Sequence, residues 1–216
     1  MKPICYIAGA SPETGEEIPF TPEEHDLVIA ADGGFALLQR MGVRCDLALG
    51  DFDSYEKPDF PSVITLNPCK DDTDTLYAVK EGLKRGYTDF RLYGVLGGAL
   101  SHTVASLQTL TFLLDHGARG FLIGNGVCAT AIRNGRIDFK AGCRGGFSVF
   151  SFDETSKGVF IQGGKFPLSD YSMTNGFPIG VSNEFTEEKL SISVCSGTLH
   201  IIFEANGGPG QAVYGC

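Results

Sequence analysis

The first 125 residues alternate between short apolar runs and segments with helical periodicity, and this alternation constrains the fold more than any other feature. Strand-like runs are expected at residues 3–8, 26–31, 45–49, 63–66, 90–93 and 120–123, and helices at residues 35–41, 73–85 and 101–116. The pattern predicts a parallel sheet with helices on both faces, a Rossmann-like α/β domain over residues 1–125. In such sheets ligands bind beyond the carboxyl ends of the strands.

The pattern changes after about residue 125, where strand-like runs recur and no helical pattern remains. These runs cover residues 129–133, 136–140, 147–152, 158–162, 190–195 and 198–204. Asn134-Gly135, between the first two runs, is a strong signal for a tight hairpin. We expect an all-β sandwich domain over residues 126–205 and a loose, Gly-rich tail over residues 206–216.

Composition favours a globular protein and excludes some partners. Of the 216 residues, 43% are hydrophobic and 20% are charged, which suits a packed core rather than a disordered chain. The formal net charge is −9 and no stripe of Lys and Arg is present, so we expect no nucleic-acid partner. No G-x-G-x-x-G follows the first strand-like run, which argues against an NAD-type enzyme.

Cysteine usage and the N-terminus indicate a cytoplasmic protein. The seven cysteines are odd in number and no pair has C-x-x-C spacing, so we expect reduced thiols rather than disulfides or a zinc site. The apolar run Ile4–Ala10 is too short for a signal peptide, and no stretch approaches the ~18 apolar residues of a membrane helix. We therefore expect no membrane association.

Two acidic clusters follow strand-like runs. In Gly50-Asp51-Phe52-Asp53-Ser54, two carboxylates two residues apart would point the same way in an extended loop. Like charges held so close repel unless a cation lies between them, and Mg²⁺ prefers such oxygen ligands. The alternative is a polar turn, because Asp, Gly and Ser all favour turns.

The second cluster, Lys70-Asp71-Asp72-Thr73-Asp74, opens a predicted helix. Thr73 is the expected N-cap, and Asp74 then lies in the first turn, where acidic side chains are favoured by the helix dipole. Asp74 is also positioned to add a third oxygen ligand to a metal held by Asp51 and Asp53. Together, the clusters predict a metal and phosphate site.

Five motifs, in their order along the chain, resemble the thiamine pyrophosphokinase family, over nearly the whole chain except the tail. The family pattern is A-D-G-G, G-D-F-D-S, K-D-x-T-D, a Gly-Gly loop that opens a helix, and G-x-S-N-E. Here these are Ala31–Gly34, Gly50–Ser54, Lys70–Asp74, Gly97-Gly98 and Gly180–Glu184. The resemblance implies Mg²⁺-dependent transfer of a pyrophosphoryl group from ATP to thiamine. It also implies a catalytic α/β domain, a C-terminal β-sandwich, and a homodimer that binds thiamine where two subunits meet.

The resemblance also implies roles for individual residues. Asp51, Asp53 and Asp74 would hold Mg²⁺ and the ATP phosphates. On chemical grounds, a carboxylate near the thiamine hydroxyl is suited to accept its proton, and we expect Asp71 or Asp74 in that role. The implied nucleotide contacts are Asp32, Gly33, Thr73, Gly97, Gly98 and His102. The implied substrate contacts are Ser182, Asn183 and Lys70.

The loop after Gly98 departs from the family pattern. Bacterial members usually read G-G-R-x-D-H, whereas this chain has Ala99 at the Arg position and Ser101 at the Asp position, followed by His102. Ala cannot clamp a phosphate as Arg does, and we expect Ser101 to cap the helix instead.

This departure leaves three hypotheses open. Another basic residue (Lys70, Arg91 or Arg133) replaces the missing Arg in an active enzyme, which we favour because the three principal carboxylates are present. Alternatively, the chain binds thiamine or its diphosphate with little catalysis. In the third hypothesis, it transfers pyrophosphate to a different acceptor.

Overall fold

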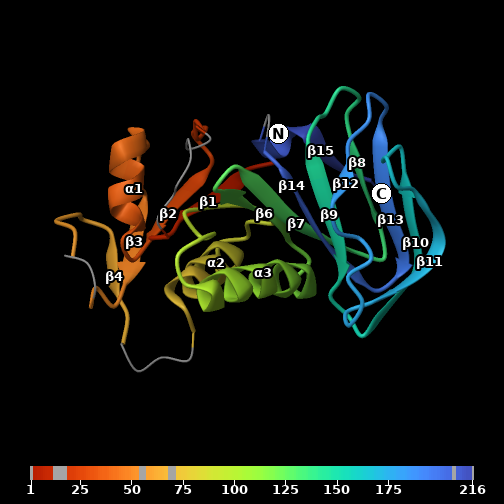
Figure 1. Cartoon of the computed structure of the whole chain (residues 1–216). Coiled ribbons are helices and arrows are strands. Elements are labelled where there is room, and N and C mark those ends of the chain that lie inside the picture. The colour runs from red at the N-terminus through yellow and green to blue at the C-terminus, as the bar shows by residue number, and fades with distance from the viewer. Residues whose placement is uncertain (1, 12–18, 54–56, 68–71, 206–207, 216) are drawn as a thin grey trace. The chain divides into compact units, whose positions relative to one another are not determined.

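The computed structural model describes residues 2–11, 19–53, 57–67, 72–205 and 208–215 (Figure 1). The chain divides into two compact units, Met1–Asn125 and Gly126–Cys216. The five cysteines within the described residues are free thiols: Cys5, Cys45, Cys128, Cys143 and Cys195. Within the same residues, no helix combines the length and the apolar character that a membrane span needs.

The sheet of the first unit is built from parallel strands, as the alternation predicts. The strands are β1 (Ile4–Ala8), β2 (Leu27–Ala31), β3 (Leu47–Gly50), β4 (Val63–Thr65), β5 (Asp89–Tyr93) and β6 (Arg119–Gly124). Their order in this unit is β6-β5-β1-β2-β3-β4, and each neighbouring pair is parallel. All residues of β2 and β3 are buried, as in strands covered on both faces.

Helices cover both faces of this sheet. α1 (Gly34–Met41) packs on β1 and β2 from one face, while α2 (Asp74–Lys84) and α3 (Leu100–Asp115) lie together on the other (Figure 1). Gly82 allows α2 to approach the sheet closely, because a Cβ there would lie 2.7 Å from the Phe90 ring and 2.8 Å from the Cys5 sulfur. The predicted mixed α/β architecture is therefore confirmed for this unit.

The strand order reverses at β1, and this reversal creates a crevice. From β1 the chain proceeds through β2, β3 and β4 on one side, then returns to β5 on the other side of β1. The loops after β1 and β5 run together, since Gly9 N donates to Tyr93 O and Ser11 N donates to Gly94 O, each at 2.8 Å. Ligands of open α/β sheets bind at such a switch point.

The second unit contains two sets of antiparallel strands. One set has the order β12 (Asn183–Glu184), β9 (Gly146–Ser151), β14 (Thr198–Glu204) and β7 (Val127–Arg133). The other has the order β11 (Leu168–Thr174), β10 (Thr155–Gln162), β13 (Leu190–Ser196), β8 (Arg136–Phe139) and β15 (Ala212–Gly215). Phe139 and Phe203 meet between the two sets with ring centroids 5.0 Å apart, so their apolar faces pack together.

The turn at Asn134-Gly135 does not close the predicted hairpin. It joins β7 to β8, which belong to different sheets of this unit. Asn134 adopts φ 46° and accepts a hydrogen bond from Gly197 N at its side-chain oxygen, 2.9 Å away. A turn does form at Asn134-Gly135 as predicted, but it is hydrogen-bonded to the turn between β13 and β14.

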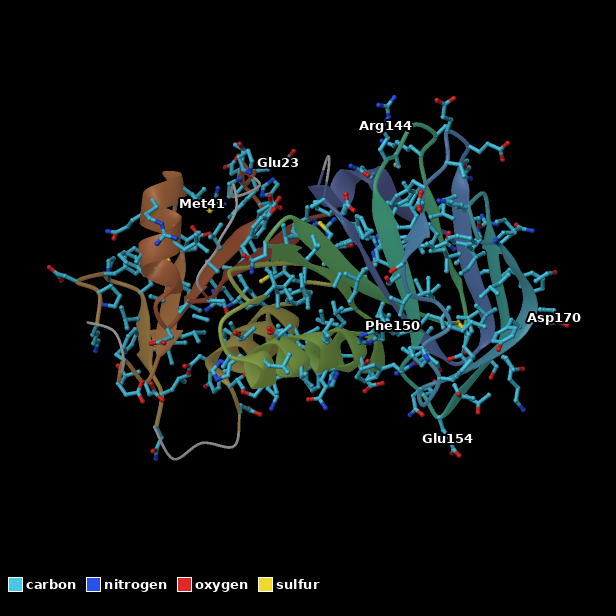
Figure 2. The ribbon with its side chains drawn as sticks, in the orientation of Figure 1. Glu23, Met41, Arg144, Phe150, Glu154 and Asp170 are labelled. Carbon is cyan, nitrogen blue, oxygen red and sulfur yellow. The ribbon has the colours of Figure 1, made fainter. Side chains whose placement is uncertain are left out.

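Two further segments differ from the prediction. The tail is not loose over residues 208–215, because a 3₁₀ turn at Gly208–Gln211 leads into β15, which pairs with β8. β11 occupies a stretch for which no strand was predicted from the sequence, and its Asp170 points away from the ribbon (Figure 2).

Candidate active site

A pocket of about 500 Å³ lies at the carboxyl edge of the parallel sheet. Its wall includes the ends of β1, β2 and β3, the first residues of α2, and one side of α3. The site predicted from strand order therefore exists as a cavity within the first unit.

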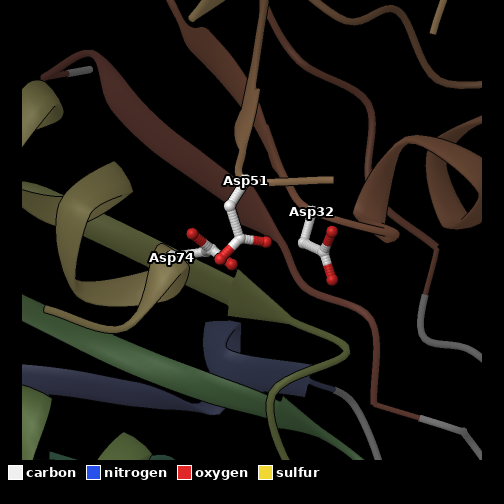
Figure 3. Close-up of side chains that lie close together, drawn as sticks. All are labelled: Asp32, Asp51 and Asp74. Atoms are coloured by element: carbon white, nitrogen blue, oxygen red, sulfur yellow. The ribbon is translucent and has the colours of Figure 1, made fainter. Parts of the chain in front are cut away.

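Three carboxylates converge in this pocket. Asp32, Asp51 and Asp74 each offer an oxygen that lies within 4.8 Å of the other two, and Figure 3 shows the three side chains close together. They come from the ends of β2 and β3 and from the start of α2. Such a set of oxygens, from three separate elements, suits a hard divalent cation.

The position of Asp32 depends on the neighbouring strand end. Asp32 adopts φ 52°, and its amide donates to Leu49 O at 2.7 Å. A Cβ on Gly50 would lie 3.0 Å from Asp32 Cα, so a glycine is needed for β3 to end this close to Asp32. The backbones at Asp32 and Gly50 therefore constrain each other's positions.

Asp74 is positioned by the helix that it opens. Thr73 Oγ1 accepts a hydrogen bond from Leu76 N at 3.1 Å, which confirms the predicted N-cap and places Asp74 in the first turn of α2. Thr73 and Asp74 both line the pocket.

One oxygen of the Asp32 carboxylate lacks a partner. Its Oδ1 is buried and, among the described residues, accepts no hydrogen bond. Burial raises the pKa of Asp32, a hydrogen bond from Gly33 N opposes that rise, and the nearby Asp74, Asp51 and Asp53 charges add to it. A cation among these oxygens would relieve both the repulsion and the unmet hydrogen-bonding capacity, so the residues fit a bound Mg²⁺.

Asp53 lies outside this cluster. Phe52 adopts φ 54°, so the segment is not the extended loop that was expected to place the two carboxylates of the D-x-D pair side by side. Asp53 is exposed, and its backbone amide, rather than its carboxylate, contacts Asp51 Oδ1, at 3.3 Å. Asp32 takes the place in the cluster that the sequence assigned to Asp53.

The Gly-Gly loop forms another part of the wall. Gly97 and Gly98 adopt φ 91° and 64°, and Gly98, Ala99 and His102 line the pocket. α3 begins after Ala99 without any side-chain cap, so the expectation that Ser101 caps it is wrong. Ser101 already lies inside the helix, where its hydroxyl cannot act as the N-cap.

None of the proposed basic replacements for the missing Arg lies in the described wall of the pocket. Arg91 donates to Phe90 O and packs over the Phe121 ring, and Arg133 donates to Thr198 Oγ1 in the second unit. Lys70 and Asp71 lie outside the described residues. Gly33, the remaining implied nucleotide contact, is buried at the start of α1.

The second unit has a groove of its own, of about 580 Å³, that includes the S-N-E segment. Ser182 is exposed there with φ 58°, and its amide donates to Ser148 Oγ. Asn183 is buried, and its side chain is engaged with the backbone: Oδ1 accepts from Phe166 N at 3.0 Å, and Nδ2 donates to Phe166 O at 2.7 Å. The structure thus brings Ser182 to the surface of the groove, whereas Asn183 holds another segment.

The sequence analysis missed that segment. Phe166 remains 57% exposed although its backbone is bound on both sides by Asn183. Lys165 reinforces it through an ion pair with Glu184 at 2.6 Å and lies over the Phe166 ring. The sequence offered only a weak signal, an aromatic residue in a Gly-rich, turn-like stretch, and periodicity does not show that this residue is exposed.

A parallel α/β unit with a carboxylate cluster at its switch point, followed by an all-β unit, is the arrangement expected of a metal-dependent enzyme that acts on a phosphate-bearing ligand. Two family profiles match the chain: "Thiamin pyrophosphokinase, catalytic domain" over residues 21–122 and "Thiamin pyrophosphokinase, vitamin B1 binding domain" over residues 136–199. The chain therefore belongs to the thiamine pyrophosphokinase family of enzymes, as its motifs predicted.

Individual relatives agree with this assignment. Thiamine pyrophosphokinase of Bacillus subtilis is 25% identical over 210 residues, covering 94% of this chain and 98% of the relative. A crystal structure of the Bacillus subtilis enzyme superposes with a TM-score of 0.82 at 25% identity, covering 93% of this chain and 98% of the other. The thiamin pyrophosphokinase of Geobacillus thermodenitrificans gives a TM-score of 0.79 at 25% identity, covering 94% and 98%.

Proposed function

We propose that the chain is a thiamine pyrophosphokinase that transfers a pyrophosphoryl group from ATP to thiamine, giving thiamine diphosphate and AMP, with Mg²⁺ as cofactor. The observation that carries the proposal is the cluster of Asp32, Asp51 and Asp74, together with the buried Asp32 Oδ1 that accepts no hydrogen bond from the described residues. This cluster lies where α/β enzymes bind phosphate-bearing ligands.

The three clustered carboxylates would hold the metal, with Asp32 added to the Asp51 and Asp74 expected from sequence. Bound Mg²⁺ would neutralise charge on the phosphate oxygens of ATP. Asp53 stays a predicted ligand, as does the role of Asp71 as proton acceptor. Asp74 is the described alternative for accepting the proton of the thiamine hydroxyl.

Other groups of the pocket would position the nucleotide. The loop at Gly97 and Gly98 brings backbone close to the cavity, and the uncapped start of α3 directs its first amides outward from the helix end. Amides at a helix N-terminus attract phosphate groups. Thr73 and His102, which line the same cavity, would add polar contacts.

Thiamine would be contacted from the second unit. Its groove carries the exposed Ser182 and two acidic side chains, Glu184 and Glu204. Acidic side chains beside aromatic ones suit a cationic ring such as the thiazolium of thiamine. From the resemblance we also infer that the chain forms a homodimer. We further propose that it is located in the cytoplasm.

A second candidate is a binding protein for thiamine or thiamine diphosphate with weak catalysis. It is favoured by one observation: among the described residues that line the acidic pocket, none is Lys or Arg. Loss of one preorganised charge-stabilising group typically lowers a rate by about 10²–10³. A transferase with another acceptor alcohol is the third possibility.

The test is AMP release from ATP and Mg²⁺, with and without thiamine. Thiamine-dependent AMP that is lost in Asp51→Asn but kept in Asp59→Asn, an exposed acidic residue outside the pocket wall, would support the transferase. Absence of AMP from a folded protein whose melting temperature still rises with thiamine would favour the binding protein. A protein that responds only to other alcohols would support a different acceptor.

A further inference from the structure

An ion pair links the start of α2 to its second turn. Lys80 Nζ lies 2.8 Å from Asp72 Oδ1 and 2.6 Å from Asp72 Oδ2. Asp72 immediately precedes the N-cap residue Thr73 and lines the acidic pocket, while Lys80 does not belong to the described pocket wall. The pair therefore connects the wall of the site to a residue outside it.

The direction of the lysine is informative. Side chains of a helix lean toward its N-terminus, so Lys80 can reach back to the residue before the cap. A cation held near a helix N-terminus is disfavoured by the helix dipole, and the Asp72 carboxylate offsets this. Lys80 Nζ also lies 5.8 Å from the centre of the Phe112 ring on α3, which gives the ammonium a second contact.

This pair has two effects on the site. It fixes the segment Asp72–Asp74, which carries the cap of α2 and one of the three clustered carboxylates. It also engages both oxygens of Asp72, so this fourth pocket acid is directed to Lys80 and not to the cluster.

We propose that Lys80 is a positioning residue for the metal site: it holds Asp72 so that Asp74 faces Asp32 and Asp51. The inference rests on the proposed function, because it assigns the cluster to a divalent cation. It concerns Asp72, which occupies the variable position of the K-D-x-T-D motif, and a lysine outside that motif.

A simple electrostatic role would have the opposite consequence. If Lys80 acted only through its charge, its removal would make the pocket more negative and tighten the binding of a divalent cation. If Lys80 positions Asp74, its removal weakens binding. Whether removal of Lys80 raises or lowers the affinity for the cation therefore distinguishes a purely electrostatic role from a positioning role.

The experiment is a calorimetric titration of the substrate-free protein with Mn²⁺, well below its melting temperature. Lys80→Met should weaken Mn²⁺ binding roughly three- to fivefold, the range expected for loss of a partly exposed ion pair. Asp72→Asn should weaken it to a similar extent, and the double variant should be no worse than either single one, because all three remove the same pair. Lys80→Arg should restore binding.

The matched control is Lys84→Met, one turn further along α2, whose ammonium lies 3.9 Å from Glu81 and is largely exposed. It should bind Mn²⁺ as the wild type does. Binding by Lys80→Met that equals or exceeds the wild type overturns the inference. So does a far larger loss in Asp72→Asn than in Lys80→Met, because Asp72 would then be a ligand itself. A wild type that binds no Mn²⁺ overturns the inference together with the proposed metal site, whereas the first two outcomes leave that site standing.

Discussion

Asn183 holds Phe166 by both backbone groups: the side-chain oxygen accepts from Phe166 N at 3.0 Å and the side-chain nitrogen donates to Phe166 O at 2.7 Å. The same oxygen also accepts from Glu184 N at 2.9 Å. A buried amide with these partners has little capacity left for a ligand. We therefore interpret Asn183 as the residue that positions Phe166 at the surface of the second unit.

Asn183→Asp tests this interpretation. The substitution keeps the shape of the side chain but removes the donor to Phe166 O, and leaving a buried polar group unpaired costs about 1–3 kcal/mol. We expect a lower free energy of unfolding and a higher KM for thiamine, with the KM for ATP unchanged. Phe166→Ala should reproduce the change in thiamine KM with little loss of stability, because the ring is exposed.

The control for this pair is Asn175→Asp, which changes an exposed Asn in the same way. It should alter neither stability nor KM. An unchanged thiamine KM in both Asn183→Asp and Phe166→Ala would contradict the role of this segment in substrate binding.

Gly50 and Asp32 provide a second prediction. A Cβ at Gly50 would meet Asp32 Cα at 3.0 Å and Asp32 N at 3.2 Å, so Gly50→Ala must displace the Asp32 backbone. Overpacking of this kind typically costs about 1–3 kcal/mol, and we expect a loss of that size in urea unfolding together with weaker Mn²⁺ binding. Gly176→Ala is the control, because a Cβ there meets no heavy atom within 4 Å. Equal Mn²⁺ affinity in the wild type and in Gly50→Ala would mean that Asp32 does not contribute to metal binding.

The α/β half of the fold was predictable because its signals are local. Helical spacing, closing glycines and short apolar runs give α1, α2, α3 and the parallel strands within a few residues of their observed ends. β11 was not predicted because it is an edge strand in which only Met173 is buried, so its sequence lacks the alternation of apolar and polar residues. β15 was not predicted because it pairs with β8, whose residues are far from it in the chain.

The sequence predicted where the candidate site lies, but not which carboxylates form the cluster there. Asp32 joins Asp51 because β2 and β3 are neighbours, which strand order decides and spacing alone does not. Asp53 was expected to lie beside Asp51 on the assumption of an extended loop, and the positive φ of Phe52 removes that geometry. The engagement of Asn183 with Phe166 depends on contacts 17 residues apart in the chain, which a motif cannot convey.

The cap of α2 gives a third prediction. Thr73 Oγ1 accepts from Leu76 N, so Thr73→Ala leaves an amide of the first turn unpaired. Loss of such a cap costs typically about 1 kcal/mol, and a free energy of unfolding measured in urea should fall by that amount. Thr73→Ser keeps the hydroxyl and should retain most of the stability. A Ser variant as unstable as the Ala variant would mean that the Thr methyl group, and not the cap, stabilises this helix end.

The last prediction concerns pH and the buried His200 in the second unit. Its ring stacks on Phe152 with centroids 4.0 Å apart, and burial lowers the pKa of His200 to about 4, although the nearby Asp153 opposes that shift. The unfolded chain therefore binds a proton at this histidine below pH ~6.5, whereas the folded chain does so only near pH 4. The stability associated with neutral His200 is complete above pH ~6.5 and is lost as the pH falls toward 4, by an amount on the order of 3 kcal/mol.

Urea unfolding of the wild type and His200→Gln at intervals from pH 7 to pH 4 measures this loss. The variant lacks the titrating ring, so its stability should fall less steeply than that of the wild type over this window, whatever its stability at pH 7. His25→Gln, which removes an exposed histidine, should keep the wild-type slope. If the wild type and His200→Gln lose stability in parallel, His200 binds its proton at the same pH in the folded and the unfolded chain, and its burial against Phe152 does not exclude the charge.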